Sequence, residues 1–287
     1  DECCLFAGGK AGHMLFNLSV VLKLTCIPEI KMKKSLSLVL LLSLTACTQV
    51  ALAQQTLRFG VDPTFPPFES KAADGSLQGF DIDLGNAICA QAKVKCQWVE
   101  MGFDSSIPAL QAKKFDAILS AMSMTDKRRQ QVAFSDMLYN TPSALLAPSA
   151  SKLTTDIASL RGKTIGVAQG TIQETYAKTK WAPEGVNVVS YPNQMEVYPD
   201  LLAGRLDGSL SDAVSAEQGF LTKPEGKDYA IKGTLVDKKI FGDGVGIALR
   251  KGDEENLKMI NAALEEIHKN GTYDQLTKKY FKFEVYP

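Results

Sequence analysis

The chain has 287 residues, and its 32 lysine and arginine residues are balanced by 32 aspartate and glutamate residues. Zero formal charge removes the bulk attraction that nucleic-acid and anionic-membrane binders use, and 45 % hydrophobic residues argue against a disordered chain. Two histidines, His13 and His268, argue against a multi-histidine metal site and against Ser-His-Asp chemistry. We therefore expect no metal, no cofactor and no catalytic residue.

Residues 1–53 are expected to lie outside the folded protein. Residues 32–53 have a short basic start, an apolar run and small residues before an expected cleavage after Ala53, which is typical of a secretory signal peptide. The apolar run is shorter than the roughly 20 residues of a membrane anchor. Residues 1–31 precede this signal and are interpreted as an upstream, non-native segment. The residues around Cys47 also match a lipoprotein box, so acylation of Cys47 competes with cleavage after Ala53.

Without residues 1–53, the chain keeps 27 basic and 29 acidic residues, a net charge of −2, and its only cysteines are Cys89 and Cys96. In an exported protein, such a closely spaced pair most simply forms one local disulfide. A catalytic redox pair would be expected at a closer spacing, such as two intervening residues, so we assign the pair a structural role.

Short β-rich runs alternate with helical patterns along the mature chain. Strands are expected at 57–61, 94–99 and 115–119, and helices at 80–92, 107–113 and from Asp126, with Thr125 as its cap. The pattern then repeats, with strands at 164–167, 186–189 and 208–210, and helices from Thr171, over 195–202 and from Asp212. A strand at 247–249 and two helices within 254–281 complete the chain. Strands separated by helical stretches predict an α/β fold with mostly parallel sheets flanked by helices.

The two series of elements predict two lobes. We place lobe 1 at residues 54–142 and 244–287, and lobe 2 at residues 143–243. The chain would cross between the lobes twice, near 139–148 and near 236–246. Two such crossings predict a hinge and a ligand cleft between the lobes.

Several polar residues follow the expected strands, where open α/β sheets bind their ligands. The Arg128 guanidinium, near the start of a capped helix, can hold a small carboxylate, and a solvated arginine beside Lys127 and Arg129 is the competing interpretation. Ser120 and Ser123 can add hydroxyl groups to the same anion or can simply form turns.

Two acids in these loops are candidates for binding a cation. Asp212 can accept a hydrogen bond from an ammonium group or only cap the helix that follows it. Asp62 can likewise accept from a cation or only initiate a turn. Phe65 and Phe103 can enclose a flat or aliphatic side chain, or they can lie in the core. The helix start at residues 169–171 permits close approach of the backbone, with ordinary capping as an equal alternative.

Six segments, taken in order, resemble the periplasmic solute-binding proteins of ABC transporters, most closely the branch that binds lysine, arginine, ornithine and histidine. They are Asp62–Phe68, Gly79–Leu84, Phe115–Ile118, Ser123–Arg128, Gly162–Val167 and Asp274–Phe281. The resemblance extends over residues 55–287 and includes the cysteine spacing. It implies a type II periplasmic binding fold whose two α/β lobes close on one free amino acid.

The resemblance also implies a role for each site residue. Arg128 would bind the α-carboxylate and Asp212 the α-ammonium, while Asp62 and Gln173 would reach toward the cationic end of a side chain that stacks on two phenylalanines. The sequence departs from the family pattern at Phe65, where an aromatic hydroxyl is common, and at Ala121 and Ile172, where Ser and Thr are common. The identity of the preferred basic amino acid therefore stays open. The expected ligand-binding set is Asp62, Phe65, Phe103, Ser120, Ala121, Ser123, Arg128, Ala168, Thr171, Ile172, Gln173 and Asp212.

We therefore expect a periplasmic receptor, not an enzyme, that binds arginine, ornithine, lysine or histidine. As partners we expect the free amino acid and an inner-membrane ABC permease, with no nucleic acid, and the protein is expected to be a monomer. Two alternatives stay open. One is an enzyme similar to periplasmic cyclohexadienyl dehydratases, although no loop acid stands out as its general acid. The other is a binding protein that serves a sensor.

Overall fold

The computed structural model describes residues 54–282 and 285. The predicted signal peptide, the upstream segment and Cys47 lie outside the described residues. Within the described part of the chain, no helix is both long enough and apolar enough to cross a membrane.

The first sheet has five strands in the order β5-β1-β6-β13-β7. The strands are β1 (Thr56–Val61), β5 (Lys95–Glu100), β6 (Ala117–Ile118), β7 (Val132–Phe134) and β13 (Ala248–Arg250). Strand β1 is parallel to β5 and β6, whereas β13 is antiparallel to β6 and β7. Since β13 follows the whole second sheet in sequence, two distant parts of the chain build this sheet.

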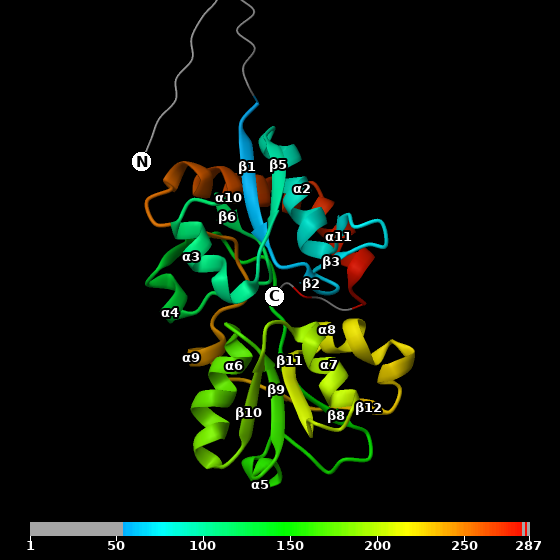
Figure 1. The fold of residues 1–287 in the computed structure, drawn as a ribbon. Coiled ribbons are helices and arrows are strands. Elements are labelled where there is room, and N and C mark those ends of the chain that lie inside the picture. Colours follow the sequence, from blue (N-terminus) through cyan, green and yellow to red (C-terminus); the bar gives the residue numbers. More distant parts are fainter. Residues whose placement is uncertain (1–53, 283–284, 286–287) are drawn as a thin grey trace, which may run out of the picture. The chain divides into compact units, whose positions relative to one another are not determined.

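Helices α2, α10 and α11 pack on one another beside the first sheet (Figure 1). The helices of this half are α2 (Phe80–Ala92), α3 (Ser106–Gln111), α4 (Asp126–Arg129), α10 (Glu254–Lys269) and α11 (Thr272–Tyr280), with the helical turn η1 (Phe103–Ser105). A small antiparallel sheet of β2 (Thr64–Phe65), β3 (Glu69–Lys71) and β4 (Leu77–Gln78) precedes α2.

The second sheet also has five strands, in the order β10-β9-β11-β8-β12. They are β8 (Ser143–Pro148), β9 (Thr164–Ala168), β10 (Asn187–Tyr191), β11 (Gly208–Asp212) and β12 (Tyr229–Leu235). Its helices are α5 (Ile157–Leu160), α6 (Ile172–Tyr176), α7 (Gln194–Leu202), α8 (Ala213–Ala216) and α9 (Lys238–Phe241), with the turns η2 (Ala177–Trp181), η3 (Ala182–Glu184), η4 (Glu217–Leu221) and η5 (Pro224–Gly226). The chain passes from one sheet to the other between β7 and β8 and returns between β12 and β13.

The predicted α/β fold is confirmed, and in each sheet the parallel strands occupy one side only. Strand β9 is parallel to β10 and β11, but β8 is antiparallel to β11 and β12. The sequence patterns did not predict β7, β8, β12 or the small sheet as strands. In β12 the pairing shifts between Ile231 and Thr234, next to Gly233, so a regular alternation of buried and exposed residues never develops.

Each sheet buries its own apolar cluster. Phe59 of β1 and Leu264 of α10 lie in the first cluster, and Val167 of β9 and Leu210 of β11 lie in the second. These cores hold the strands in place, and the loops at the strand ends carry polar side chains.

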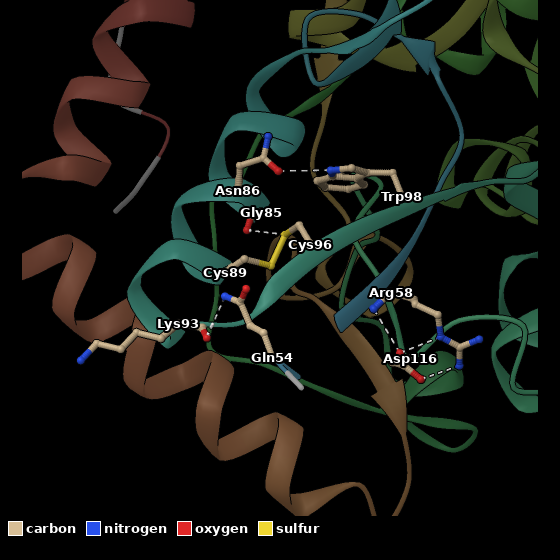
Figure 2. The surroundings of a disulfide bond; sticks show 9 residues. All are labelled: Gln54, Arg58, Gly85, Asn86, Cys89, Lys93, Cys96, Trp98 and Asp116. Carbon is tan, nitrogen blue, oxygen red and sulfur yellow. Dashed lines mark hydrogen bonds and ion pairs between the residues drawn. A yellow bond between two sulfur atoms is a disulfide. The ribbon is translucent and has the colours of Figure 1, made fainter. Parts of the chain in front are cut away.

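The predicted disulfide is present and joins Cys89 of α2 to Cys96 of β5 (Figure 2). Removing it by a double Cys→Ser substitution is expected to lower the free energy of unfolding by about 2.5 kcal/mol, because a short loop is no longer closed in the unfolded chain. Urea denaturation of the ligand-free protein measures this difference. Wild-type protein treated with a reducing agent is the matched control and should fall to the stability of the variant; equal stability of all three forms would contradict the prediction.

Candidate functional site

A cavity of about 580 Å³ lies at the carboxyl ends of parallel strands from both sheets. Asp62 follows β1, Ser120 follows β6, Ala168 ends β9 and Asp212 ends β11. This is the place where open α/β sheets bind ligands. The structure brings together the whole predicted ligand-binding set, since every one of those residues lines this cavity.

Arg128 is buried at 9 % exposure on α4, whose N-cap Thr125 accepts a hydrogen bond from the Arg128 backbone N–H. Its Nη1 donates to the Ser123 carbonyl at 2.9 Å, and its Nη2 donates to the Gly170 carbonyl at 3.0 Å. The guanidinium lies 5.3 Å from the centre of the Phe103 ring. The interpretation of Arg128 as a solvated surface residue is therefore wrong.

No carboxylate within residues 54–282 forms an ion pair with the Arg128 guanidinium. Burial alone lowers the pKa of Arg128 to about 10. A buried charge without a counter-ion is costly, and a guanidinium has five N–H donors of which the two carbonyls use only part. Arg128 is thus suited to receive an anion from the cavity.

Asp212, at the end of β11, also lines the cavity and is buried. Its Oδ1 accepts from the backbone N–H groups of Val214 at 2.8 Å and Ser215 at 2.9 Å, and its Oδ2 accepts from the Thr141 hydroxyl. The capping interpretation is thus confirmed, and it does not remove Asp212 from the cavity. Burial raises the pKa of Asp212 to about 6 despite these three donors, so a nearby cation would stabilise its charged form.

Asp62 is the second buried acid of the cavity, at 7 % exposure. Its Oδ1 accepts from the Thr64 hydroxyl at 2.8 Å and its Oδ2 from the Phe103 backbone N–H at 3.0 Å. Burial is the main cause that raises the pKa of this carboxyl. The same hydrogen bond to Phe103 fixes the turn η1, which carries one of the aromatic rings of the site.

Two aromatic rings from the first half of the chain border the cavity. Phe65 is half-buried and stacks on Phe68 at 5.6 Å between ring centres, while half-buried Phe103 lies under the Arg128 guanidinium. Both rings keep part of their surface free of protein contacts. They can therefore pack against an aliphatic or flat ligand group.

The second sheet contributes the segment after β9. Thr171 caps α6 by accepting from the Glu174 backbone N–H at 3.1 Å, and its hydroxyl donates to the Ala168 carbonyl. Gln173 is buried and its Nε2 donates to the Ser143 hydroxyl at 3.0 Å, while Ile172 lines the cavity between them. Thr171 therefore caps α6 and also lines the cavity.

The serine hydroxyls differ in their availability. The Ser120 hydroxyl donates to Glu69 Oε1 at 2.9 Å, and its oxygen accepts from the Asp62 backbone N–H, so its single hydrogen is used inside the protein. Ser123 is partly exposed, and its carbonyl holds Arg128. Ala121 has a positive φ of 46° and donates its backbone N–H to Asp81.

Glu69 and Thr141 also line the cavity and were not predicted as site residues. Glu69 looks like one polar residue of an exposed hairpin, and Thr141 like a loop residue. Their partners, Ser120 and Asp212, are 51 and 71 positions away in the sequence. No local pattern reports such contacts.

The fold and the cavity define a protein that binds a small polar molecule between two α/β halves, and comparison with known proteins agrees. The family model "Bacterial extracellular solute-binding proteins, family 3" matches residues 57–283. The chain belongs to this family.

Named relatives and solved structures support the same assignment. The chain is 53 % identical over 258 residues to the "Lysine/arginine/ornithine-binding periplasmic protein" of Escherichia coli, covering 89 % of this chain and 99 % of the relative. It is 48 % identical over 257 residues to the "Histidine-binding periplasmic protein" of Salmonella typhimurium, covering 89 % and 98 %. The solved structure of "An ancestral arginine-binding protein bound to arginine" has a TM-score of 0.74 at 37 % identity, covering 79 % and 99 %. These relatives are binding proteins, and the prediction that the chain is not an enzyme is confirmed.

Proposed function

We propose that the protein is a periplasmic receptor that binds arginine, ornithine, lysine or histidine as the free L-amino acid and delivers it to an ABC importer. One observation carries this proposal: Arg128, a buried cation with no counter-ion among residues 54–282, shares a cavity with two buried acids, Asp212 and Asp62. The two named relatives bind lysine, arginine and ornithine or histidine, which are basic amino acids.

The assignment of ligand groups follows from charge. A zwitterion that leaves water must exchange its hydration shell for fixed partners. Arg128 would take the α-carboxylate in a charge-assisted hydrogen bond, and Asp212 would take the α-ammonium. Asp62 would then bind the cationic end of the ligand side chain, which would lie between Phe65 and Phe103.

For the release of the ligand we propose a hinge. Lobe 1 would comprise residues 54–142 and 244–287, lobe 2 residues 143–243, and the crossings near 139–148 and 236–246 would bend. Ligand binding would shift an open population toward the closed form, which the permease recognises. The receptor would act as a monomer after export and removal of its signal peptide.

Calorimetric titration with a panel of free amino acids tests the proposed function. The protein should first be unfolded, dialysed and refolded to remove any ligand that copurifies. At least one basic amino acid is expected to bind with a Kd below about 10 μM, which corresponds to roughly −7 kcal/mol. No binding of any basic amino acid at this level would overturn the proposal.

Replacing Asp62 with asparagine tests the charge preference. The variant is expected to bind arginine about 10- to 150-fold more weakly, the equivalent of a charged hydrogen bond of roughly 1.5–3 kcal/mol. Its affinity for glutamine, which has a similar length and no side-chain charge, should change little. Asp104→Asn is the matched control, because Asp104 is an exposed acid near Asp62. An equal loss for both ligands would contradict the assigned role.

A further inference from the structure

Glu69 of β3 is a cavity residue for which the proposed binding scheme has no use. Its side chain is buried at 1 % exposure. Glu69 Oε1 accepts from the Ser120 hydroxyl at 2.9 Å, but Oε2 accepts a hydrogen bond from none of the residues that the structure describes. A buried carboxylate oxygen without a donor is strongly destabilising if it is charged.

Glu69 is connected to Asp62 through Ser120. The Ser120 hydroxyl gives its one hydrogen to Glu69, so its oxygen is left to accept from the Asp62 backbone N–H at 3.0 Å. The Asp62 carboxylate in turn is held by Thr64 and by the backbone of Phe103. Glu69 therefore positions the acid that we assign to the cationic end of the ligand.

The groups around Glu69 are acids and a phenol. Asp81 of α2 is its neighbour, and both oxygens of Asp81 have donors: the Tyr139 hydroxyl at 2.9 Å and the Ala121 backbone N–H at 2.8 Å. The negative charge of Asp62 also raises the pKa of Glu69. The charge of Asp212, from the second sheet, likewise contributes to the raised pKa of Tyr139. Across residues 54–282, no lysine or arginine forms an ion pair with Asp62, Glu69 or Asp81.

A proton on Glu69 accounts for the oxygen that lacks a donor. Burial, followed by the negative charge of Asp81, holds the pKa of Glu69 well above its usual range, while burial raises the pKa of Asp81 to about 6. Once protonated, Glu69 is itself a donor, and Asp81 is the acceptor beside it. Two buried carboxyl groups that share one proton carry one negative charge instead of two.

We propose that Glu69 is a further specificity-determining residue, which holds a proton in the ligand-free site and releases it when a cationic side chain binds beside Asp62. The O–H bond of Glu69 breaks, solvent buffer takes the proton, and the ligand cation replaces its positive charge. The site then presents two carboxylates to a cationic side chain, whereas a neutral side chain leaves the proton in place. This inference rests on the proposed function, because it requires a ligand with a cationic side chain.

Calorimetry in two buffers of different ionisation enthalpy at pH 7 measures the protons released on binding. Arginine is expected to release a larger fraction of a proton than glutamine. Protons released from Asp212, which would hold the α-ammonium group of either amino acid, cancel in this comparison. Glu69→Gln reproduces the protonated glutamate, since its amide oxygen can accept from Ser120 and its NH₂ can donate to Asp81.

The Glu69→Gln variant should therefore fold and bind arginine, but the extra proton release should disappear. Asp104→Asn, which removes an exposed acid near Asp62, should keep this extra proton release. Equal proton release by wild type and Glu69→Gln, or on binding of arginine and of glutamine, would overturn the inference. As long as arginine still binds, the proposed function would not be affected by that result. Absence of arginine binding would overturn both.

A second readout needs no ligand. Glu69 binds its proton more tightly in the folded than in the unfolded chain, so the wild type should lose stability as pH rises above the ordinary glutamate pKa of 4.5. Glu69→Gln lacks this loss, and its melting temperature should exceed that of the wild type at pH 7 and approach it at pH 4. A constant difference across this range would count against a protonated Glu69.

Should the variant not fold, infrared spectra of the wild type still decide, because arginine binding must remove the carbonyl band of a protonated carboxyl group; its persistence overturns the inference.

Discussion

Replacing Arg128 with alanine is expected to weaken arginine binding about 30- to 5,000-fold, the equivalent of roughly 2–5 kcal/mol. The ligand α-carboxylate would enter a buried cavity without a cation to receive it. Since no ion pair within the described residues is lost, the ligand-free variant should still fold. Calorimetric titration gives the affinity, and a thermal melt without ligand checks the fold.

The neighbouring Lys127 provides the matched control for Arg128. It lies on the same helix, carries the same charge and is exposed, so Lys127→Ala should bind arginine like the wild type. Arg128→Lys keeps the charge and loses the forked donor geometry, and it should fall between wild type and Arg128→Ala. An Arg128→Ala affinity within about twofold of wild type, a difference of roughly 0.4 kcal/mol, would show that Arg128 does not hold the carboxylate.

Replacing Gly170 with alanine is expected to weaken arginine binding about 5- to 150-fold, because a methyl group at this position obstructs the close approach of Asp104 from the other half of the chain. A Cβ on Gly170 would lie 2.8 Å from Asp104 Cα and 3.1 Å from Asp104 Cβ. Gly170 precedes α6 of the second sheet and Asp104 belongs to η1 beside the first, so this contact joins the two halves. Its carbonyl also accepts from Arg128 Nη2.

Gly162→Ala separates obstruction from backbone strain. Gly162 has a φ of +72°, close to the +75° of Gly170, yet a Cβ there meets no atom within 4 Å. Both variants should lose a similar amount of stability from the left-handed backbone, roughly 1–2 kcal/mol each. Only Gly170→Ala should lose affinity. If the two variants bind arginine equally well, the contact between Gly170 and Asp104 does not limit closure.

Much of the site was predictable because the positions of its residues follow from local patterns. The helix caps Thr125, Thr171 and Asp212 were recognised from a polar residue that precedes a helical stretch, and the structure confirms all three. The carboxyl end of a parallel strand is recognisable in the same way. These two signals place Arg128 and Asp62 near a common edge without any knowledge of the packing.

Other features depend on contacts that no local pattern records. The antiparallel part of the first sheet arises because β13 inserts between β6 and β7, more than a hundred residues after both of them. The use of the Ser120 hydroxyl is decided by Glu69, which belongs to a different element. For the same reason the local sequence left two interpretations of Arg128 open, a solvated arginine and a ligand-binding one.

Local sequence is enough to predict the alternation of strands and helices, the three caps, the disulfide partners and the set of polar residues at the strand ends, because each depends on residues that are near in the chain. Which charges are buried without a counter-ion among residues 54–282, and which hydroxyls already donate within the protein, follows from the packing of the folded chain. Burial and hydrogen bonding depend on what packs on a residue from distant parts of the chain, and in this protein those contacts turn ordinary loop residues such as Arg128 and Glu69 into parts of one cavity.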